Sequence, residues 1–279
     1  MSKYKIIQIT DTHLTPIGAD AANNQEIDPC EKLDNIFIDI NKMPEKPDLI
    51  AITGDLIHEG TTDDYDKLSQ LIEYYRNLLD IPIQVVLGNH DRTTPFFEGY
   101  LKAKPRDKYY YLQETPNINI YFLDSKFYNY EQGYLGQEQL DWLKDHLLDD
   151  PKDSMIFLHH PIDGPSIHHM RYSILQESDE LMQIIKDSPV RAVFSGHIHF
   201  ETSFVRNGIL LHSTDSSAYH INCDDEHKHY IYDATYYDII TIDDDGTIGT
   251  ETRCLYEGYN VINNVDVDDT DFVDESIFE

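Results

Sequence analysis

Cysteine is scarce in this chain of 279 residues, and its three cysteines, Cys30, Cys223 and Cys254, lie far apart in the sequence. An odd number of widely spaced cysteines, without a Cys-x-x-Cys pair, is typical of reduced thiols and not of a disulfide framework or thiolate metal site. Long apolar runs are also absent: the segment MSKYKIIQIT leads into a short candidate strand, and no stretch has the length of a membrane span. These absences predict a cytoplasmic protein that does not enter a membrane.

Basic residues are also scarce. The chain has 21 lysines and arginines but 52 aspartates and glutamates, which gives a net charge of −31. A surface with this excess of negative charge disfavours general binding to nucleic acid and to anionic membranes, because both bind basic patches. The 40% of hydrophobic and 26% of charged residues are an ordinary globular balance, so the chain can bury a sizeable core.

One domain is predicted for residues 1–256, because no repeat, long linker or low-complexity block divides them. Its last part, residues 200–256, is rich in hairpin signals. The segment 257–279 is acidic and weakly patterned, and we expect it to be a loosely held tail. The sequence leaves open whether the protein forms a homodimer.

Short apolar runs alternate with helical patterns over roughly the first two hundred residues, which is the signature of an α/β architecture. Apolar residues at i, i+3, i+4 and i+7 predict helices around residues 33–40, 68–79 and 140–147. Beyond residue 200, the turn signals Asn207-Gly208 and Asp245-Gly246 predict hairpins. The candidate strands are Tyr4–Thr10, Asp48–Thr53, Ile81–Leu87, Ile118–Leu123, Met155–His159 and Val190–Ser195, then Phe204–Arg206, Ile209–His212, Tyr236–Ile242 and Thr247–Cys254.

Polar motifs follow five of the first six candidate strands. In open α/β sheets, ligands bind beyond the carboxyl ends of the strands, so these motifs are expected to meet at one edge. Each motif alone has a simpler interpretation as a turn or a helix cap, but caps and turns have no reason to be rich in histidine at successive strand ends. The motifs are Thr10-Asp11-Thr12-His13, Thr53-Gly54-Asp55, Gly88-Asn89-His90-Asp91, His159-His160-Pro161 and Gly196-His197-Ile198-His199.

The side chains in these motifs indicate a metal centre. Imidazole, carboxylate and one amide oxygen, without thiolate, suit zinc, iron, manganese or cobalt. Seven candidate ligand groups exceed the needs of one ion and fit two ions about 3.5–4 Å apart that share a carboxylate. Such a site lowers the pKa of a bound water and neutralises the oxygens of a phosphoryl group.

In this order along the chain, the five motifs resemble those of the calcineurin-like metallophosphoesterases. A narrower resemblance, to the cyclic AMP branch of the bacterial class III cyclic-nucleotide phosphodiesterases, covers residues 4–256. The family implies a four-layer α/β/β/α sandwich of two mixed β-sheets. The narrower resemblance is carried by Gln8-Ile9-Thr10-Asp11-Thr12-His13-Leu14, Leu123-Asp124-Ser125, Gly136-x-x-x-Leu140-x-Trp142-Leu143 and Ser195-Gly196-His197-Ile198-His199.

The resemblance also implies the roles of the site residues. His159 is preferred to His160 as a ligand, because the family ligand lies two positions before the proline. His90 would be the catalytic residue beside the phosphate or the leaving oxygen. One metal ion would be held by Asp11, His13, Asp55 and His199, and the other by Asp55, Asn89, His159 and His197, with Asp55 bridging the two.

Four further residues are expected near the substrate or behind the ligands. Asp91 would support His90 or cap the next helix, and His160 would lie beside the ligand His159. His168 and His169 could reach over the site and touch the substrate, although an exposed loop is the simpler interpretation.

Two other groups of residues are interpreted as structural. The segment Cys223–His229 is expected to be a solvated loop and not an additional metal site. The tyrosines are expected to be structural or rim residues, not a platform on which a base stacks; they are Tyr109, Tyr110, Tyr111, Tyr128, Tyr130 and Tyr134.

The resulting functional prediction is a phosphodiesterase with two divalent or trivalent ions of iron, manganese or zinc. A metal-bridged hydroxide would attack a small phosphodiester, and cyclic nucleotides such as cyclic AMP are the expected substrates. Other small phosphodiesters, phosphomonoesters and phosphoproteins are the alternative substrates. A non-catalytic scaffold is disfavoured because all seven ligand positions and His90 are present, and a nuclease is disfavoured by the net charge of −31.

Overall fold

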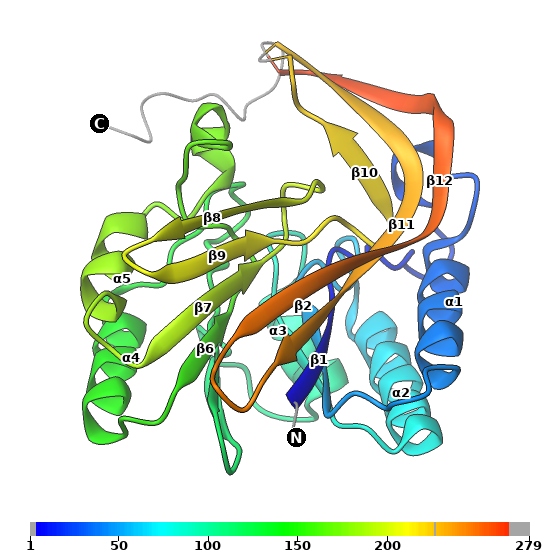
Figure 1. The fold of residues 1–279 in the computed structure, drawn as a ribbon. Helices are drawn as coiled ribbons and strands as arrows, with labels where there is room; N and C mark the ends of the chain where they lie inside the picture. Colours follow the sequence, from blue (N-terminus) through cyan, green and yellow to red (C-terminus); the bar gives the residue numbers. More distant parts are fainter. Residues whose placement is uncertain (1–3, 226, 268–279) are drawn as a thin grey trace.

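Two β-sheets lie face to face in the computed structural model, which describes residues 4–225 and 227–267. Helices cover the outer face of each sheet, so the molecule has four layers (Figure 1). Both sheets contain parallel and antiparallel pairs. The α/β/β/α sandwich of two mixed sheets is therefore confirmed.

The first sheet has the strand order β10-β11-β1-β2-β3, with β12 paired to β11. Strands β1, β2 and β3 are parallel, and β11 runs antiparallel to β1. Beyond the sandwich, β10, β11 and β12 rise together as a twisted extension (Figure 1). The strands are β1 (Tyr4–Ile9), β2 (Leu49–Thr53), β3 (Ile83–Val86), β10 (Tyr219–Asn222), β11 (Lys228–Ile242) and β12 (Ile248–Asp266).

The second sheet has the order β4-β5-β6-β7-β9-β8. Its four central strands are parallel, and the edge strands β4 and β8 are antiparallel to their neighbours. At the predicted Asn-Gly turn between β8 and β9, Asn207 and Gly208 have φ of 55° and 80°, as such a hairpin requires. The strands are β4 (Tyr111–Glu114), β5 (Asn119–Phe122), β6 (Ser154–Phe157), β7 (Val190–Ser195), β8 (Thr202–Arg206) and β9 (Ile209–Ser213).

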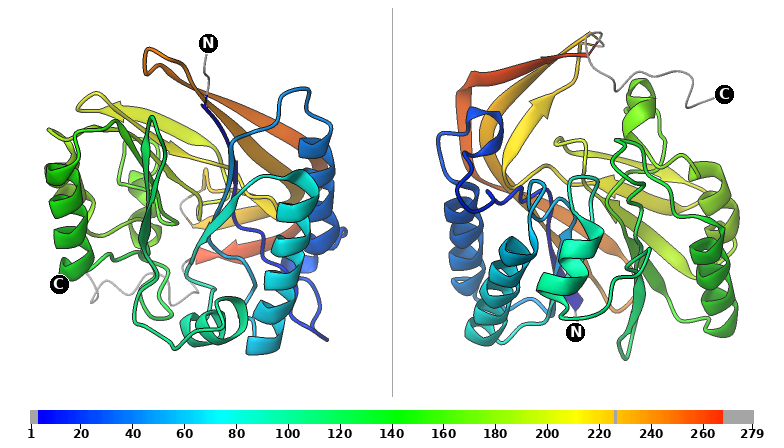
Figure 2. Two further views of the ribbon diagram at one scale, coloured as in Figure 1. Left: turned by 90° about the horizontal axis from the view of Figure 1, so that it is seen from below. Right: turned by 180° about the vertical axis from the view of Figure 1, so that it is seen from behind.

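Helices α1 (Pro29–Asn41) and α2 (Thr62–Leu79) cover the first sheet, whereas α4 (Gln137–Asp149) and α5 (Ser178–Ile185) cover the second (Figure 2). Thr61 and Asp64 form a capping box that starts α2. The remaining turns of helix are short. They are η1 (Ala22–Asn24), α3 (Thr93–Pro95), the π-turn η2 (Phe96–Tyr100) and η3 (His168–Ser173).

Successive side chains of a strand point to opposite faces of its sheet, and this alternation decides which part of the core each side chain enters. In β1, Ile7 and Ile9 pack against the helices of the first sheet, whereas Ile6 points into the layer between the sheets. Both faces of these strands are buried, which explains why they are near-continuous apolar runs in the sequence. The strands are therefore rigid supports for the loops that follow them.

Several boundaries differ from the sequence predictions. Strands β4 and β10 and helix α5 were not predicted, and β11 and β12 are longer than expected. The predicted tail is wrong for residues 257–266, because these residues pair with β11. Side chains on β12 are mostly exposed or half-buried, so no apolar alternation marks this strand. Residues 268–279 of that predicted tail lie outside the described residues.

The segment Cys223–His229 also differs from its interpretation as a solvated loop. Cys223 is buried, and Lys228 and His229 already belong to β11.

Across residues 4–225 and 227–267, no helix combines the length and the apolar character that crossing a membrane needs.

Candidate metal centre

Loops from both sheets meet where β1, β2, β3, β6 and β7 end. Backbone hydrogen bonds join these loops: the N–H of Asp11 donates to Gly54 O at 3.1 Å, that of His13 to Asp55 O at 2.8 Å, and that of Gly196 to His159 O at 2.9 Å. The loops are also closely packed, since a Cβ atom on Gly88 would collide with Asp55. All seven predicted ligand residues are buried at this junction; they are Asp11, His13, Asp55, Asn89, His159, His197 and His199.

Five of the seven residues have a left-handed backbone, which is uncommon for residues other than glycine. Such conformations cost on the order of 1–3 kcal/mol each and persist only where the surrounding structure imposes them, most often at functional sites. Here each one turns the chain sharply at the end of a strand and leaves the side chain at the junction. The φ angles are 51° for Asp11, 40° for His13, 47° for Asp55, 73° for His197 and 54° for His199.

One half of the junction brings together Asp11, His13 and His199, whose ligand atoms lie within 4.8 Å of one another. The Nε2 atoms of His13 and His199 are 3.2 Å apart, and His199 Nε2 is 3.3 Å from Asp11 Oδ1. The Nδ1 atom of His199 faces the carbonyl oxygen of Tyr219 at 2.7 Å. This contact fixes the ring so that Nε2 points at the cluster.

The other half is centred on His159. Its Nε2 atom is 3.1 Å from Asn89 Oδ1, 3.2 Å from His197 Nδ1 and 3.4 Å from Asp55 Oδ2. Its Nδ1 atom faces Thr53 O at 2.8 Å, so this ring too is oriented from behind. Asp55 Oδ2 is also 3.6 Å from His13 Nε2, and Asp55 therefore lies between the two halves.

The charges of this junction suit cations. Burial by itself would raise the pKa of Asp11, but His199 and His159 outweigh it and hold that pKa well below its usual range. Burial would lower the pKa of His159, yet Asp55 and Asp11 raise it to about 9. In the described structure, buried Asp11 Oδ1 makes no hydrogen bond. A buried polar atom without a partner is costly, and metal coordination would satisfy it.

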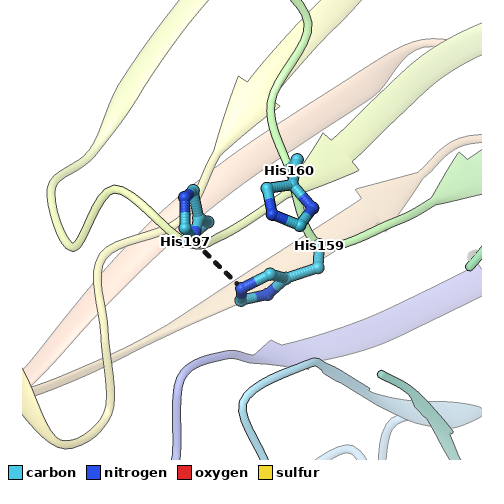
Figure 3. Close-up of side chains that lie close together, drawn as sticks. All are labelled: His159, His160 and His197. Carbon is cyan, nitrogen blue, oxygen red and sulfur yellow. Dashed lines mark hydrogen bonds between the residues drawn. The ribbon is translucent and has the colours of Figure 1, made fainter. Parts of the chain in front are cut away.

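His160 lies beside His159 and His197, and ligand atoms of the three rings are within 4.8 Å of one another (Figure 3). Its ring centre is 4.4 Å from that of His197, and its Nδ1 atom is 2.8 Å from Ser125 Oγ. Ser125 follows β5, the one early strand whose end was given no metal role. This strand end thus contributes to the junction indirectly, by orienting the imidazole that packs on His197.

His90 stands at the mouth of the junction. Its backbone N–H donates to Asp55 Oδ1 at 2.9 Å, and its ring stacks on His58 with 4.5 Å between centres. A cavity of about 240 Å³ opens here, with Asp55, His90, His197 and His199 among its lining residues.

Comparisons with known proteins give the family. The profile of the calcineurin-like phosphoesterases matches residues 4–201. The chain belongs to this family. It is a metal-dependent phosphoric ester hydrolase, and its junction of histidines and aspartates fits the dinuclear metal centre of the family.

Relatives of this phosphoesterase agree on the type of reaction. A probable glycerophosphodiester phosphodiesterase from Arcobacter nitrofigilis is 31% identical over 78% of the chain and 80% of the relative. A cAMP/cGMP dual-specificity phosphodiesterase from Mycobacterium tuberculosis is 29% identical over 77% of the chain and 68% of the relative. Among solved structures, a purple acid phosphatase from yellow lupin seeds shares the fold, with a TM-score of 0.53 and 13% identity over 90% of this chain and 53% of that one.

Asp91 of this phosphoesterase does not cap the next helix, and it supports the loop of His90 through main-chain N–H groups. Its buried carboxylate accepts hydrogen bonds from the N–H groups of Gly88 at 2.9 Å and Leu56 at 3.1 Å, and from the hydroxyl of Tyr65 at 2.7 Å. No side chain caps helix α3. Asp91 instead ties the loop after β3 to the loop after β2, because main-chain N–H groups from both converge on it.

The two histidines of η3 lie away from the cavity. The side chain of His168 is 80% exposed and contacts Asp163, whereas His169 Nε2 is 3.2 Å from the carbonyl oxygen of Cys223. Both side chains are exposed and neither lines the cavity, which agrees with the simpler interpretation of these two residues as exposed. The same turn lines it with Met170, Tyr172 and Ser173.

Three residues of the site were missed in the sequence. His58 Nδ1 is 3.3 Å from His13 Nδ1, the Tyr219 hydroxyl is 3.3 Å from His13 Nε2, and Glu131 Oε2 accepts from Asn89 Nδ2 at 3.2 Å. Only His58 had a local signal, since it follows Asp55 by three positions at a strand end. Glu131 and Tyr219 lie in segments without a motif.

Proposed function

We propose that this phosphoesterase is a phosphodiesterase that uses two metal ions and hydrolyses small diesters, with 3′,5′-cyclic nucleotides such as cyclic AMP as the first substrate class. The observation that carries the proposal is the carboxylate of Asp55, which lies between two sets of ligand atoms beside a cavity lined by His90. The names of the relatives support a diester as the substrate.

The residues fit two ions in the arrangement that the family resemblance implies. When bound, the two ions would neutralise charge on the phosphoryl oxygens and supply a water of lowered pKa. Their identity among iron, manganese and zinc remains a prediction. The first ion would be held by Asp11, His13, Asp55 and His199, and the second by Asp55, Asn89, His159 and His197.

His90 is the proposed catalytic residue. Its backbone is fixed by Asp55 and its ring is supported by His58, while the side chain remains half-buried at the cavity. From this position an imidazole N–H can donate to the leaving oxygen as negative charge develops on it. His58 would keep the ring of His90 in place and is a positioning residue.

The shape of the cavity supports a small substrate. Its volume of about 240 Å³ is at or below the small end of ligand pockets, which hold roughly 300–1,000 Å³. Apolar side chains of β10, β11 and β12 face it, among them Ile221, Ile231 and Val265. Such a wall would pack against the organic part of a diester, whereas a phosphoprotein would need an open surface.

Glycerophosphodiesters are the second candidate, because a relative at 31% identity is named for that activity. Both substrates present a phosphodiester to the same ligands and differ in the group that meets the apolar wall. A ring of a nucleoside would gain more from that wall than glycerol, since apolar burial scales with area.

The test is turnover of cyclic AMP, a glycerophosphodiester, an aryl phosphodiester and an aryl phosphomonoester, each with manganese, zinc or iron. We expect the diesters to be hydrolysed faster than the monoester, with cyclic AMP fastest among the natural ones. His90→Ala should lose about 10²–10⁴-fold in kcat, the usual contribution of a general acid. His168→Ala is the matched control, because that imidazole is exposed and outside the cavity.

Each outcome has a distinct meaning. A faster glycerophosphodiester would transfer the proposal to the second candidate. Faster hydrolysis of the monoester would overturn the diester assignment. An enzyme that retains full activity as His90→Ala would remove the catalytic role of His90 but leave the metal ligands in place.

A further inference from the structure

A second cavity is lined in part by Thr93 and Thr94, which follow the loop that carries Asn89 and His90. Its volume is about 520 Å³, about twice that of the cavity at the metal centre. Arg106, Lys108 and Lys126 line it, and Asp107 is the one acidic residue among the described lining residues. In a chain with 21 basic and 52 acidic residues, three cations around one cavity form an unusual positive site.

These cations are not equally engaged. The ammonium of Lys108 donates to three carbonyl oxygens, those of Asp124, Lys126 and Tyr134, which uses all its protons. Lys126 donates to the carbonyl oxygens of Asn89 and Tyr128, so one N–H of its ammonium is left over. Lys108 therefore stabilises the wall of the cavity, whereas Lys126 has one N–H available for a ligand.

Arg106 is the cation with the greatest freedom. It is exposed, and the structure, over residues 4–225 and 227–267, gives it no ion pair. A guanidinium binds phosphate or carboxylate through two parallel hydrogen bonds. Thr93 and Thr94 also line the cavity and bring hydroxyl groups, which are further donors for an anion.

Aromatic rings form another part of the same wall. Phe127 contacts Tyr134 with 4.5 Å between ring centres and Tyr128 with 4.9 Å. Tyr128 is 74% exposed and has a left-handed backbone with φ of 49°. Exposed rings beside cations offer flat apolar area to a ligand that carries both a ring and a negative charge. As an exposed ring that lines the cavity, Tyr128 agrees with the interpretation of these tyrosines as structural or rim residues.

The cavity is also connected to the metal centre. The ammonium of Lys126 donates to Asn89 O at 2.7 Å, and the side-chain oxygen of Asn89 is 3.1 Å from His159 Nε2. A negative ligand that accepts the remaining N–H of Lys126 would draw the ammonium toward this cavity and lengthen its hydrogen bond to Asn89 O. Asn89 would then be held less firmly against the second half of the site.

We propose that this cavity is a second binding site, for a small molecule that carries both an anionic group and a planar ring, such as a nucleoside monophosphate. Its occupancy changes turnover at the metal centre through Lys126 and Asn89. Binding at this cavity does not depend on which substrate the enzyme hydrolyses. The effect on turnover rests on the proposed role of Asn89 as a metal ligand.

A local reporter tests the binding. The variant Tyr128→Trp of the zinc-loaded enzyme introduces an indole at the cavity, and the one native tryptophan, Trp142, lies in α4. We expect AMP to change its fluorescence saturably, and to bind at least about tenfold more weakly when Arg106→Glu is added. Adenosine and inorganic phosphate should each bind more weakly than AMP. Lys144→Glu, which reverses a charge on the exposed face of α4, is the matched control.

Several results would overturn the site. They are equal AMP binding with and without Arg106→Glu, inorganic phosphate that binds as tightly as AMP, and adenosine that binds as tightly as AMP. Isothermal titration calorimetry with AMP gives an independent measurement. The zinc-loaded Arg106→Glu variant should bind one equivalent of AMP fewer than the zinc-loaded wild type. AMP bound at the metal centre would be unaffected by this variant, so the two sites are distinguished.

Kinetics test the effect on turnover. With saturating aryl phosphodiester, we expect AMP to change kcat of the wild type but not of Arg106→Glu. An increase of KM alone in both enzymes would be competition at the metal centre and would overturn the coupling. An enzyme inactive toward every diester would contradict the proposed function and leave the fluorescence result as it stands.

Discussion

The side-chain amide of Asn89 donates a hydrogen bond to the carboxylate of Glu131, with 3.2 Å between Nδ2 and Oε2, although 42 positions separate them in the sequence. This contact decides which way the amide points. Because Nδ2 is engaged by Glu131, Oδ1 faces His159 Nε2 at 3.1 Å. An amide can bind a metal ion only through its oxygen, so Glu131 prepares Asn89 for the role proposed above.

Glu131→Ala should therefore weaken metal binding and activity by about 10–100-fold, the usual effect of losing a residue that orients a ligand. Titration with zinc, followed by activity at each concentration, measures the change. Glu138→Ala, on the exposed side of α4, is the control for lost charge. Unchanged zinc affinity in Glu131→Ala would show that Asn89 is oriented without this carboxylate.

Asp55→Asn tests the shared carboxylate. Because Asp55 lies between both halves of the site, its loss should affect both ions, and metal content should fall from two per chain to below one. Metal analysis after dialysis measures this, with Asp145→Asn, on the exposed face of α4, as the control. Retention of two ions would contradict the bridging role.

Removing the ions from the wild type should stop turnover and lower the melting temperature. The two buried carboxylates, Asp11 and Asp55, would then face each other without the cations that the site suits, and their repulsion destabilises the fold. Differential scanning fluorimetry before and after treatment with a chelator checks the shift, and added zinc should reverse it. A melting temperature unaffected by the chelator would mean that the ions do not stabilise this junction.

Lys32→Met should destabilise the fold by about 3–5 kcal/mol, the typical cost of breaking a buried ion pair from one side. Lys32 of α1 and Asp233 of β11 are both buried and form an ion pair, and Lys32 also donates to the carbonyl oxygen of Ala218. Urea denaturation gives the difference in the free energy of unfolding. Lys67→Met, at an exposed position of α2, should change it by less than about 1 kcal/mol.

The three thiols should differ in reactivity. Burial raises the pKa of Cys223 to about 12, so at pH 8 almost none of this thiol is in the reactive thiolate form. Cys30 and Cys254 are exposed. We expect a thiol reagent to modify two cysteines in the native protein and all three after denaturation. Rapid modification of Cys223 in the native state would show that the cavity opens widely in solution.

The sequence by itself determined the framework of this protein. Buried strands such as β1 and β2 are apolar on both faces, and the stripes of α1 and α2 follow the helical period, so both are readable from local spacing. The five motifs at the strand ends were readable for the same reason. Each is a few consecutive residues at a strand end. The parallel order of the strands carries three motifs to one edge of the first sheet and two to one edge of the second, and the packing of the sheets brings these edges together.

Tertiary structure decided the features that depend on distant partners. Strand β12 exists because β11 pairs with its backbone, whatever its side chains are, and its exposed residues carry no alternation. Glu131 meets Asn89, and Lys126 reaches the same residue, only after β3 and β5 are placed in opposite sheets. A hydrogen bond between remote residues leaves no periodic trace in the sequence, because it depends on the position of two atoms and not on a repeated pattern along the chain.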